Sequence, residues 1–225
     1  KIRDLVKEGE KEFILENVNG QYYIACGVKG NVSFIVNGVP GNDLGAFMDG
    51  PSIIVNNNSQ DNIGNTMNSG KIIVKGDSGD VIGYAMRGGK IFIKGDVGYR
   101  VGIHMKEYME NKPVIIAGGC AGDFCGEYMA GSILILLGLN RKENKPIAGD
   151  YLGTGMHGGV IYINGEVDKS TLGKEVGIVL LDDNDKRLLK ELLAEYSKDF
   201  DVKEEINVNN FTKLIPVSNR PYGNL

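Results

Sequence analysis

The side chains able to do chemistry in this chain of 225 residues are few and far apart in the sequence. Three cysteines are present, at Cys26, Cys120 and Cys125. Cys120 and Cys125 have neither a second cysteine pair nor a nearby histidine, so their spacing does not indicate a metal site. We expect both to be buried structural cysteines. An odd and sparse set of cysteines also favours a reducing compartment, and we expect a cytoplasmic protein.

The two histidines do not share a position relative to the methionines beside them. His104 precedes Met105, whereas His157 follows Met156. No Ser/His/Asp or Cys/His combination can be assembled from such positions with any specificity. We therefore expect no catalytic residue, no cofactor-binding residue and no metal ligand in this chain.

A literal GxGxxG sequence spans residues 153–158, as Gly-Thr-Gly-Met-His-Gly. A dinucleotide-binding site needs this motif to follow a strand and open a helix. Here an aliphatic segment typical of a strand, Val160–Ile163, follows the motif instead. We interpret the motif as one copy of a repeated turn.

Gly-x-x-Met segments recur along the chain, and six of its seven methionines end such a segment. The first four segments begin at positions 45, 64, 83 and 102, which is a constant period of 19, and the last two begin after longer intervals, at 126 and 153. The residues of this structural repeat are Gly45, Met48, Gly64, Met67, Gly83, Met86, Gly102, Met105, Gly126, Met129, Gly153 and Met156.

Seven aliphatic segments keep the same register as the Gly-x-x-Met turns. The first four begin at positions 34, 53, 72 and 91, again one period apart, and the later ones begin at 114, 133 and 161. The extra residues fall at 106–113 and 139–149, which read as loops inserted into a regular array. The segments are Phe34–Val36, Ile53–Val55, Ile72–Val74, Ile91–Ile93, Val114–Ile116, Ile133–Ile135 and Ile161–Ile163.

This repeat predicts an all-β parallel β-helix of about seven coils. Strands of three or four residues cannot stand alone, but stacking them at ~4.8 Å pairs their backbones and aligns identical side chains. Of the 33 glycines, 28 lie between Gly27 and Gly165, where sharp corners with positive φ suit glycine. Three residues before the repeat glycine, a short acidic or amide side chain can hydrogen-bond to the turn backbone. These residues are Asn42, Asp61, Asp80, Asp123 and Asp150.

Other interpretations of the repeat fit less well. A methionine column could suit Cu(I), but a stacked core row explains the same register without metal. The calcium-binding β-roll needs a nonapeptide period, and a hexapeptide acyltransferase needs multiples of six. A carbohydrate-active β-helix enzyme needs clustered carboxylates or arginines on one face, and the six arginines fall in no column.

Charge and hydropathy argue against nucleic-acid-binding and membrane-bound classes of protein. The net charge is −4 and no block of lysine and arginine is present, so we expect no nucleic-acid partner. No apolar run approaches the ~20 residues that span a bilayer, so we expect no membrane partner.

Three regions follow from the repeat. Residues 1–26 are expected to lead into or cap the array, 27–167 to form the β-helix, and 168–225 to form a C-terminal helix and an extended tail. Leucines at 188, 189, 192 and 193 have helical spacing, with Asp182 or Asp183 as the N-cap. We expect this helix to cover an end of the array and the tail to run along it or reach a partner.

Several turns resemble the GXGXG domain at the C-terminus of the glutamate synthase large subunit. The most specific match is Glu-Tyr-Met-Ala-Gly at 127–131, with further matches at 64–67, 122–131 and 153–159. The end of the chain, 211–223, resembles the free-standing archaeal-type subunit. The resemblance implies a right-handed β-helix that is non-catalytic and braces a glutamine amidotransferase unit and a synthase unit. FMN and an iron–sulfur cluster are then expected on the partner subunit, with no cofactor in this chain.

A sister family also resembles this array: the third subunit of formylmethanofuran dehydrogenase, a molybdenum or tungsten enzyme. Residues 76–86 fit either family, whereas the tail and residues 127–131 favour glutamate synthase. We expect partner contacts at the loops 106–113 and 139–149 and at the tail 206–225. Self-association into a homo-oligomer stays open.

Overall fold

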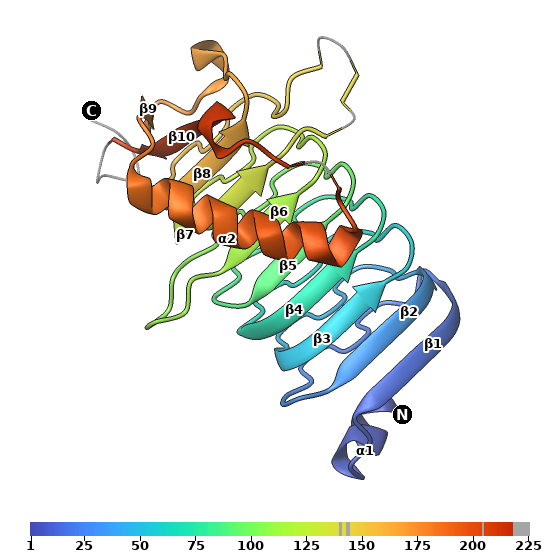
Figure 1. The fold of residues 1–225 in the computed structure, drawn as a ribbon. Coiled ribbons are helices and arrows are strands. Elements are labelled where there is room, and N and C mark those ends of the chain that lie inside the picture. Colours follow the sequence, from blue (N-terminus) through green and yellow to red (C-terminus); the bar gives the residue numbers. More distant parts are fainter. Residues whose placement is uncertain (140, 143–144, 204, 218–225) are drawn as a thin grey trace.

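The computed structural model describes residues 1–139, 141–142, 145–203 and 205–217, and its strands build a solenoid (Figure 1). Within these residues ten strands form a single sheet. The first eight pair in chain order and in parallel. They are β1 (Glu12–Asn19), β2 (Ser33–Val39), β3 (Asp49–Val55), β4 (Ser69–Val74), β5 (Lys90–Ile93), β6 (Val114–Ala117), β7 (Ala130–Leu136) and β8 (Gly158–Asn164).

The predicted fold class is confirmed, with about six turns of solenoid in place of about seven. Each of the seven predicted aliphatic segments lies within β2–β8. Identical residue types face one another across the coils, as in the pairing of Ile53 with Ile72 and of Ile72 with Ile91. The period of the sequence repeat therefore sets the register of the parallel strands.

Alternation along each strand separates an inner from an outer row of side chains. Phe34, Ile53 and Ile72 point into the solenoid and are fully or almost fully buried. The methionines of all six Gly-x-x-Met turns are fully buried in the same core. Their unbranched side chains fill the space inside the corners together with the strand isoleucines, as Met48 does beside Ile53 and Ile72 near Gly45.

The corners have an alternating backbone conformation that the glycines make possible. The repeat glycines have φ between 67° and 74°, the left-handed region that costs glycine nothing. Non-glycine residues two positions before them also have positive φ, including Asp43, Asn62 and Arg100. Each such residue costs free energy, and the backbone hydrogen bonds between coils hold the corners in place.

The array extends further toward the N-terminus than the expected start at residue 27. The strand β1 lies in the region expected to be a lead-in, and it pairs with β2. A corner precedes Val28, with positive φ at Tyr23, Ala25 and Gly27. Ala25 and Val28 stand where later corners have glycine and methionine. A short helix, α1 (Ile2–Lys7), lies before β1.

Two antiparallel strands close the C-terminal end of the sheet. The strand β10 (Phe211–Pro216) pairs with β8 on one side and with β9 (Val176–Val179) on the other. Leu214 is fully buried. Part of the segment that we expected to run along the array or reach a partner is thus built into the fold. Short 3-10 helices at Lys169–Thr171 and Val208–Asn210 connect these elements, and residues 218–225 of the predicted tail lie outside the described residues.

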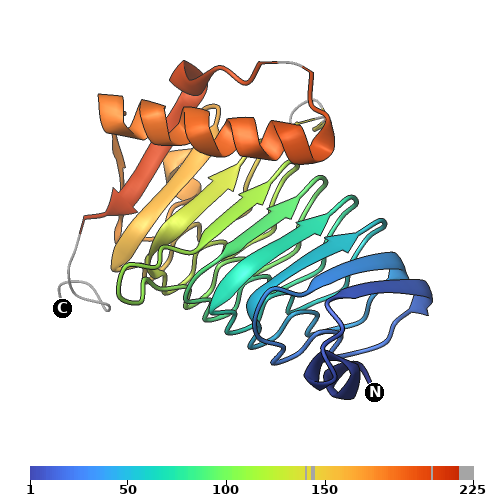
Figure 2. The same cartoon turned by 60° about the horizontal axis from the view of Figure 1, so that its bottom comes forward.

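The helix α2 (Asp183–Phe200) forms as predicted but covers a different surface. It crosses the strands on the outer face of the sheet instead of covering an end of the array (Figures 1 and 2). Leu189, Leu193 and Tyr196 pack against outward-facing residues of the sheet in a second hydrophobic core. The N-cap is Asp182, in a capping box with Asp185.

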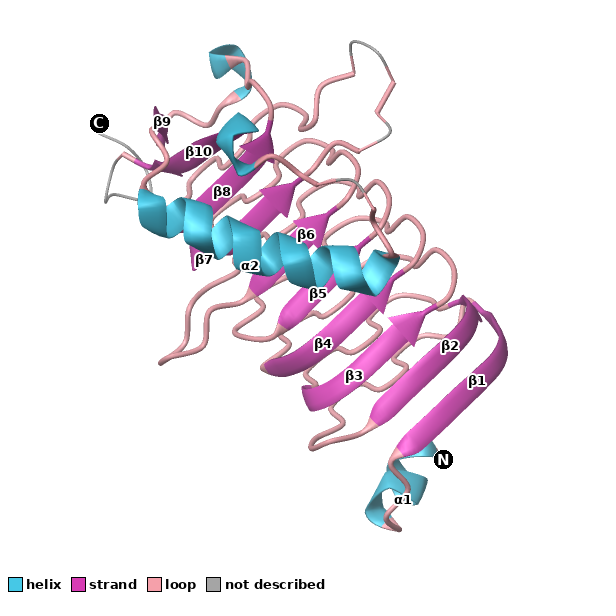
Figure 3. Ribbon diagram, in the orientation of Figure 1, coloured by secondary structure: helices cyan, strands magenta, loops and turns pink. Residues whose placement is uncertain are grey.

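Figure 3 shows how little of the molecule is helical. Among the described residues, no helix is long and apolar enough to cross a bilayer.

Candidate interaction surfaces

The cysteines and histidines do not form a reactive site. Cys120 and Cys125 are buried and Cys26 is half-buried, and all three are free thiols. Burial raises the pKa of the Cys125 thiol to about 12 and also raises the pKa of Cys120. Thiols with raised pKa values are poor nucleophiles at neutral pH. Across the described residues, no group of three or more His, Cys, Asp or Glu side chains is arranged to hold a metal ion.

The GxGxxG sequence forms the last corner of the array and leads into β8. In earlier corners, the residue two positions after the repeat glycine donates its N–H to a carbonyl of the next coil, as Tyr128 does to Thr154. At the last corner, the N–H of Gly155 instead donates to the Glu175 carboxylate, at 3.1 Å. A carboxylate thus takes the place of the next-coil carbonyl at this position, while Leu152 still pairs with Leu172.

The acidic side chains before the repeat glycines form a ladder between coils. The Oδ1 atom of Asp61 accepts the N–H of Asp80 at 2.9 Å, and Oδ1 of Asp80 accepts the N–H of Tyr99 at 2.8 Å. Asp123 accepts the N–H of Asp150 in the same way, at 2.9 Å. The bond that we expected to the turn backbone goes to the turn of the following coil. Each carboxylate keeps its second oxygen, Oδ2, outside this ladder.

A second ladder runs parallel to the first and was not predicted. The side-chain oxygen of Asn58 accepts the N–H of Asp77, and Asp77 accepts the N–H of Asp96, at 2.9 and 2.8 Å. Asp96 in turn accepts the N–H of Cys120. The signal for it was present in the Gly-Asp dipeptides at 76–77 and 95–96, which are one repeat period apart.

Aromatic side chains stack on the outside of the corners in the C-terminal half of the array. The rings of Phe124 and Tyr151 stack with centroids 4.8 Å apart, and those of His104 and Tyr128 with centroids 5.3 Å apart. Tyr84 meets His104 edge-on. These distances follow from the spacing of the coils, which brings equivalent side chains into the range of favourable ring stacking. These columns were not predicted from the sequence.

An arginine and a buried glutamate complete this surface. The guanidinium of Arg100 lies 4.6 Å from the centre of the Phe124 ring and forms an ion pair with Glu127. Glu127 is one of the few buried charged residues of the described chain. We call this surface the aromatic corner, and its members are Tyr84, Arg100, His104, Phe124, Glu127, Tyr128 and Tyr151.

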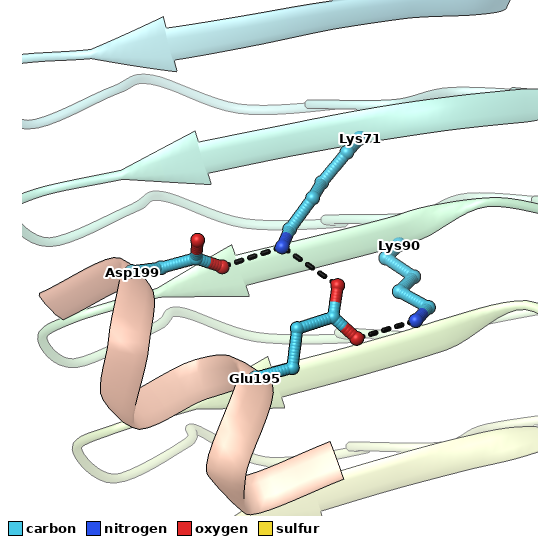
Figure 4. A network of polar contacts seen from close by, with 4 residues as sticks. All are labelled: Lys71, Lys90, Glu195 and Asp199. Atoms are coloured by element: carbon cyan, nitrogen blue, oxygen red, sulfur yellow. Dashed lines mark hydrogen bonds and ion pairs between the residues drawn. The ribbon is translucent and has the colours of Figure 1, made fainter. Parts of the chain in front are cut away.

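Charged groups also fix α2 on the sheet (Figure 4). Nζ of Lys71 pairs with Glu195 at 2.7 Å and with Asp199 at 2.5 Å, and Nζ of Lys90 pairs with Glu195 at 2.5 Å. Burial alone would raise the pKa of Glu195, but hydrogen bonds from the two lysines outweigh it and hold the pKa below its usual value. This network positions the helix by its C-terminal half.

A buried polar cluster joins α2 to the C-terminal strands. The Asp185 carboxylate accepts hydrogen bonds from the Tyr162 hydroxyl at 2.6 Å and from Nζ of Lys213 at 2.7 Å. Burial and the neighbouring Asp185 raise the pKa of Tyr162 well above its usual range. Burial opposes ionisation of Asp185, but the bonds from Lys213 and Tyr162 hold its pKa low. Every group in the cluster has a partner, which indicates a structural joint and not a reactive site.

The loops that we expected to contact a partner differ in exposure. In the loop 106–113, Tyr108 and Met109 are largely exposed. In the loop 139–149, Ile147 is buried and Lys145 forms an ion pair with Asp96, while residues 140 and 143–144 lie outside the described residues. In the segment 206–217, Phe211 and Leu214 are buried. Partner contact at these loops stays a prediction.

The repeat and its corners correspond to a known family. The family described as "GXGXG motif" matches residues 13–217, which is most of the chain and includes nearly all of β1. The chain belongs to the GXGXG family. This family is associated with glutamate synthase.

One relative has a similar length and matches along the whole of this GXGXG chain. The protein is 46% identical, over 234 residues, to the "Uncharacterized protein MJ1350" of Methanocaldococcus jannaschii. The comparison covers all of this chain and 90% of that relative. The likeness establishes a shared family.

Proposed function

We propose that this GXGXG protein is a non-catalytic scaffold subunit of a glutamate synthase complex. In this role it braces a glutamine amidotransferase unit and an FMN- and iron–sulfur-containing synthase unit. The complex would convert glutamine, 2-oxoglutarate and reductant into glutamate. The chemistry would belong to the partners and the rigid spacing between them to this chain.

The observation that carries this proposal is the family match over residues 13–217. A family associated with glutamate synthase limits the kinds of assembly in which such a chain is expected. The chemistry of the described residues supports a structural role, because carboxylates such as Asp61, Asp77 and Asp185 are used in ladders, caps and ion pairs between coils and elements.

The solenoid is also mechanically suited to bracing. Successive coils are joined along the strands by parallel pairing and along the corners by backbone hydrogen bonds and the acidic ladders. In such an array each coil contacts its neighbours, so the molecule has a fixed length and long continuous side surfaces. Partner subunits docked on one side would be held at a fixed separation.

Affinity purification of the full chain tests this proposal. We expect a tagged chain, expressed in its own host, to retain a glutaminase-type subunit and a second subunit with bound FMN and iron. The retained material should have flavin absorbance and a stoichiometric iron content. A protein with the same tag and a similar isoelectric point, but outside the GXGXG family, serves as the control.

Two outcomes would contradict the proposal. Retention of molybdopterin-enzyme subunits would replace it with a role like that of the third subunit of formylmethanofuran dehydrogenase. Retention of no flavoprotein at all, in lysates that contain glutamate synthase activity, would reject the scaffold role in that complex.

A further inference from the structure

The exposed aromatic side chains of the chain concentrate on the corners of the solenoid. Tyr84, Tyr99 and Tyr151 are 38%, 53% and 55% exposed, although large aromatic groups are usually covered. Each of the three stands close to a repeat glycine in the sequence. The two stacked pairs of the aromatic corner, His104 with Tyr128 and Phe124 with Tyr151, extend over three successive coils.

Stacking of the coils does not require these aromatic groups. The corners at Gly64 and Gly83 have the same backbone conformation. Two residues before the repeat glycine they have Asn62 and Val81, where the aromatic corner has Phe124 and Tyr151. Two residues after the repeat glycine they have Thr66 and Ala85, where the aromatic corner has His104 and Tyr128. Small side chains therefore suffice to build a corner, and the stacked aromatic pairs are a property of this one part of the surface.

A row of carboxylates lies beside the aromatic corner. Asp80, Asp123 and Asp150 stand three residues before their repeat glycines. Oδ1 of Asp80 and Oδ1 of Asp123 each accept a backbone N–H, and Asp150 follows Asp123 in the ladder. Among the described residues, none of the three forms an ion pair. This surface thus offers both aromatic faces and anionic oxygens to a partner.

The protein already shows which side chain fits such a surface. Arg100 lies over the face of Phe124 and pairs with Glu127 at the same time. Guanidinium groups stack on aromatic rings and bind carboxylates with two parallel hydrogen bonds, whereas the lysine ammonium is a strongly hydrated point charge. Arginines of a partner would repeat this arrangement at Tyr84 and Tyr151.

We propose that the aromatic corner is the docking surface for a protein partner that presents arginine side chains. The inference rests on the proposed function, because it names the surface by which the scaffold holds a neighbouring subunit. Aromatic residues and arginines are the groups that most often dominate the energy of protein interfaces.

Binding of peptide probes to the purified full chain tests the surface without any partner subunit. We expect a fluorescent nona-arginine peptide to bind about tenfold more tightly than nona-lysine at ~0.15 M salt. In the double variant Tyr84→Ser/Tyr151→Ser, we expect the arginine peptide to lose most of this advantage. The matched control is Tyr22→Ser/Tyr23→Ser, which removes two tyrosines that are each 62% exposed at another corner.

Equal affinity for the two peptides, or equal losses in the two double variants, would overturn the proposal. Co-purification separates it from the proposed function. If the wild-type chain and the Tyr84→Ser/Tyr151→Ser variant retain the same subunits equally well, the surface is wrong and the scaffold role stands. If arginine-selective binding is found but no glutamate synthase subunit is retained, the surface stands and the complex is another one. Circular dichroism and thermal unfolding confirm that each variant is folded.

Discussion

At the scale of single residues, the Gly-Asx dipeptides explain how successive coils approach one another so regularly. A Cβ atom built on Gly95 would lie 1.9 Å from Oδ1 of Asp77, and one on Gly79 would lie 2.0 Å from Oδ1 of Asp61. Each carboxylate occupies the space that the glycine side chain leaves empty and accepts the N–H of the next residue. The glycine and the acid one coil earlier therefore act as a pair.

Substitution of Gly95 tests this pairing. We expect Gly95→Ala to lower the free energy of unfolding by about 1–3 kcal/mol, because the new methyl group overlaps the Asp77 carboxylate. The backbone of Gly95 is not in the left-handed region, so the loss reports crowding and not backbone strain. Chemical denaturation of the single variant measures it.

A double-mutant cycle provides the control. Asp77→Ala removes the carboxylate that would overlap, so Gly95→Ala should cost much less in that background. Additive losses in the two single variants and the double variant would show that the methyl group does not compete with this carboxylate.

The thiols give a second prediction at the residue scale. Because burial raises the pKa of Cys125 to about 12 and raises that of Cys120, both stay protonated at pH 8. We expect an aromatic disulfide reagent to modify one of the three thiols in the folded protein, the half-buried Cys26, and all three in guanidinium chloride. A Cys26→Ser variant should lose the fast reaction. Rapid modification of two or more thiols in the folded state would contradict the buried environment.

At the scale of elements, the outer face of the sheet determines where α2 lies. One outward column begins with Ser33 and Ser52, continues with Lys71 and Lys90, and becomes apolar from Val114 onward. The helix covers the apolar part, and its carboxylates reach back to the two lysines (Figure 4). The N-terminal part of this face has no such cover, and Ile14 is 65% exposed there.

The ion network predicts a pH-dependent contribution of α2 to stability. The pKa of Glu195 is lowered in the fold, so its contribution is present above the unfolded-state pKa of about 4.3 and is lost as pH falls through the folded-state value. We expect Glu195→Gln to lower the free energy of unfolding by about 1 kcal/mol at pH 7, since the group is partly exposed. Toward pH 3.5 the difference from wild type should shrink.

Urea unfolding at both pH values measures this difference. Glu191→Gln, on the exposed side of the same helix, is the matched control and should leave stability unchanged at either pH. A loss for Glu195→Gln that is the same at both pH values would indicate a packing effect and not a charge effect.

Some of these elements could be predicted from the sequence and others could not. The aliphatic segments and Gly-x-x-Met turns predicted β2–β8, because residues one repeat period apart in the sequence pair with one another in neighbouring coils. The strand β1 was missed because its corner has Ala25 and Val28 in place of glycine and methionine. The helix was found from its leucines, but its position depended on outward-facing columns such as Val114 and Ile133. The aromatic corner arises from side chains of different coils, so it emerges only when equivalent positions are stacked.

At the scale of the whole molecule, the two ends of the solenoid are protected in different ways. At the C-terminal end, the antiparallel strands β10 and β9 follow β8, and Glu175 caps the last corner. At the N-terminal end, β1 is the edge of the sheet. There α1 provides the cover, with Ile2 and Val6 packed against the core and Arg3 bonded to the carbonyl of Cys26. A solenoid end without cover would expose both apolar core and unpaired strand backbone.

Removal of α1 should therefore make the chain associate end to end. We expect a variant that lacks residues 1–10 to form concentration-dependent oligomers beyond those of the intact chain, because Phe13, Leu15 and the edge of β1 become accessible together. Size-exclusion chromatography with light scattering measures the change. Ile2→Ser/Val6→Ser should act in the same direction, whereas Leu180→Ser, at a side chain that is 94% exposed, should leave association unchanged. Identical elution of the truncated and intact chains across all concentrations would show that β1 is protected by its own sequence, through charges such as Glu12 and Glu16, and that α1 has another role.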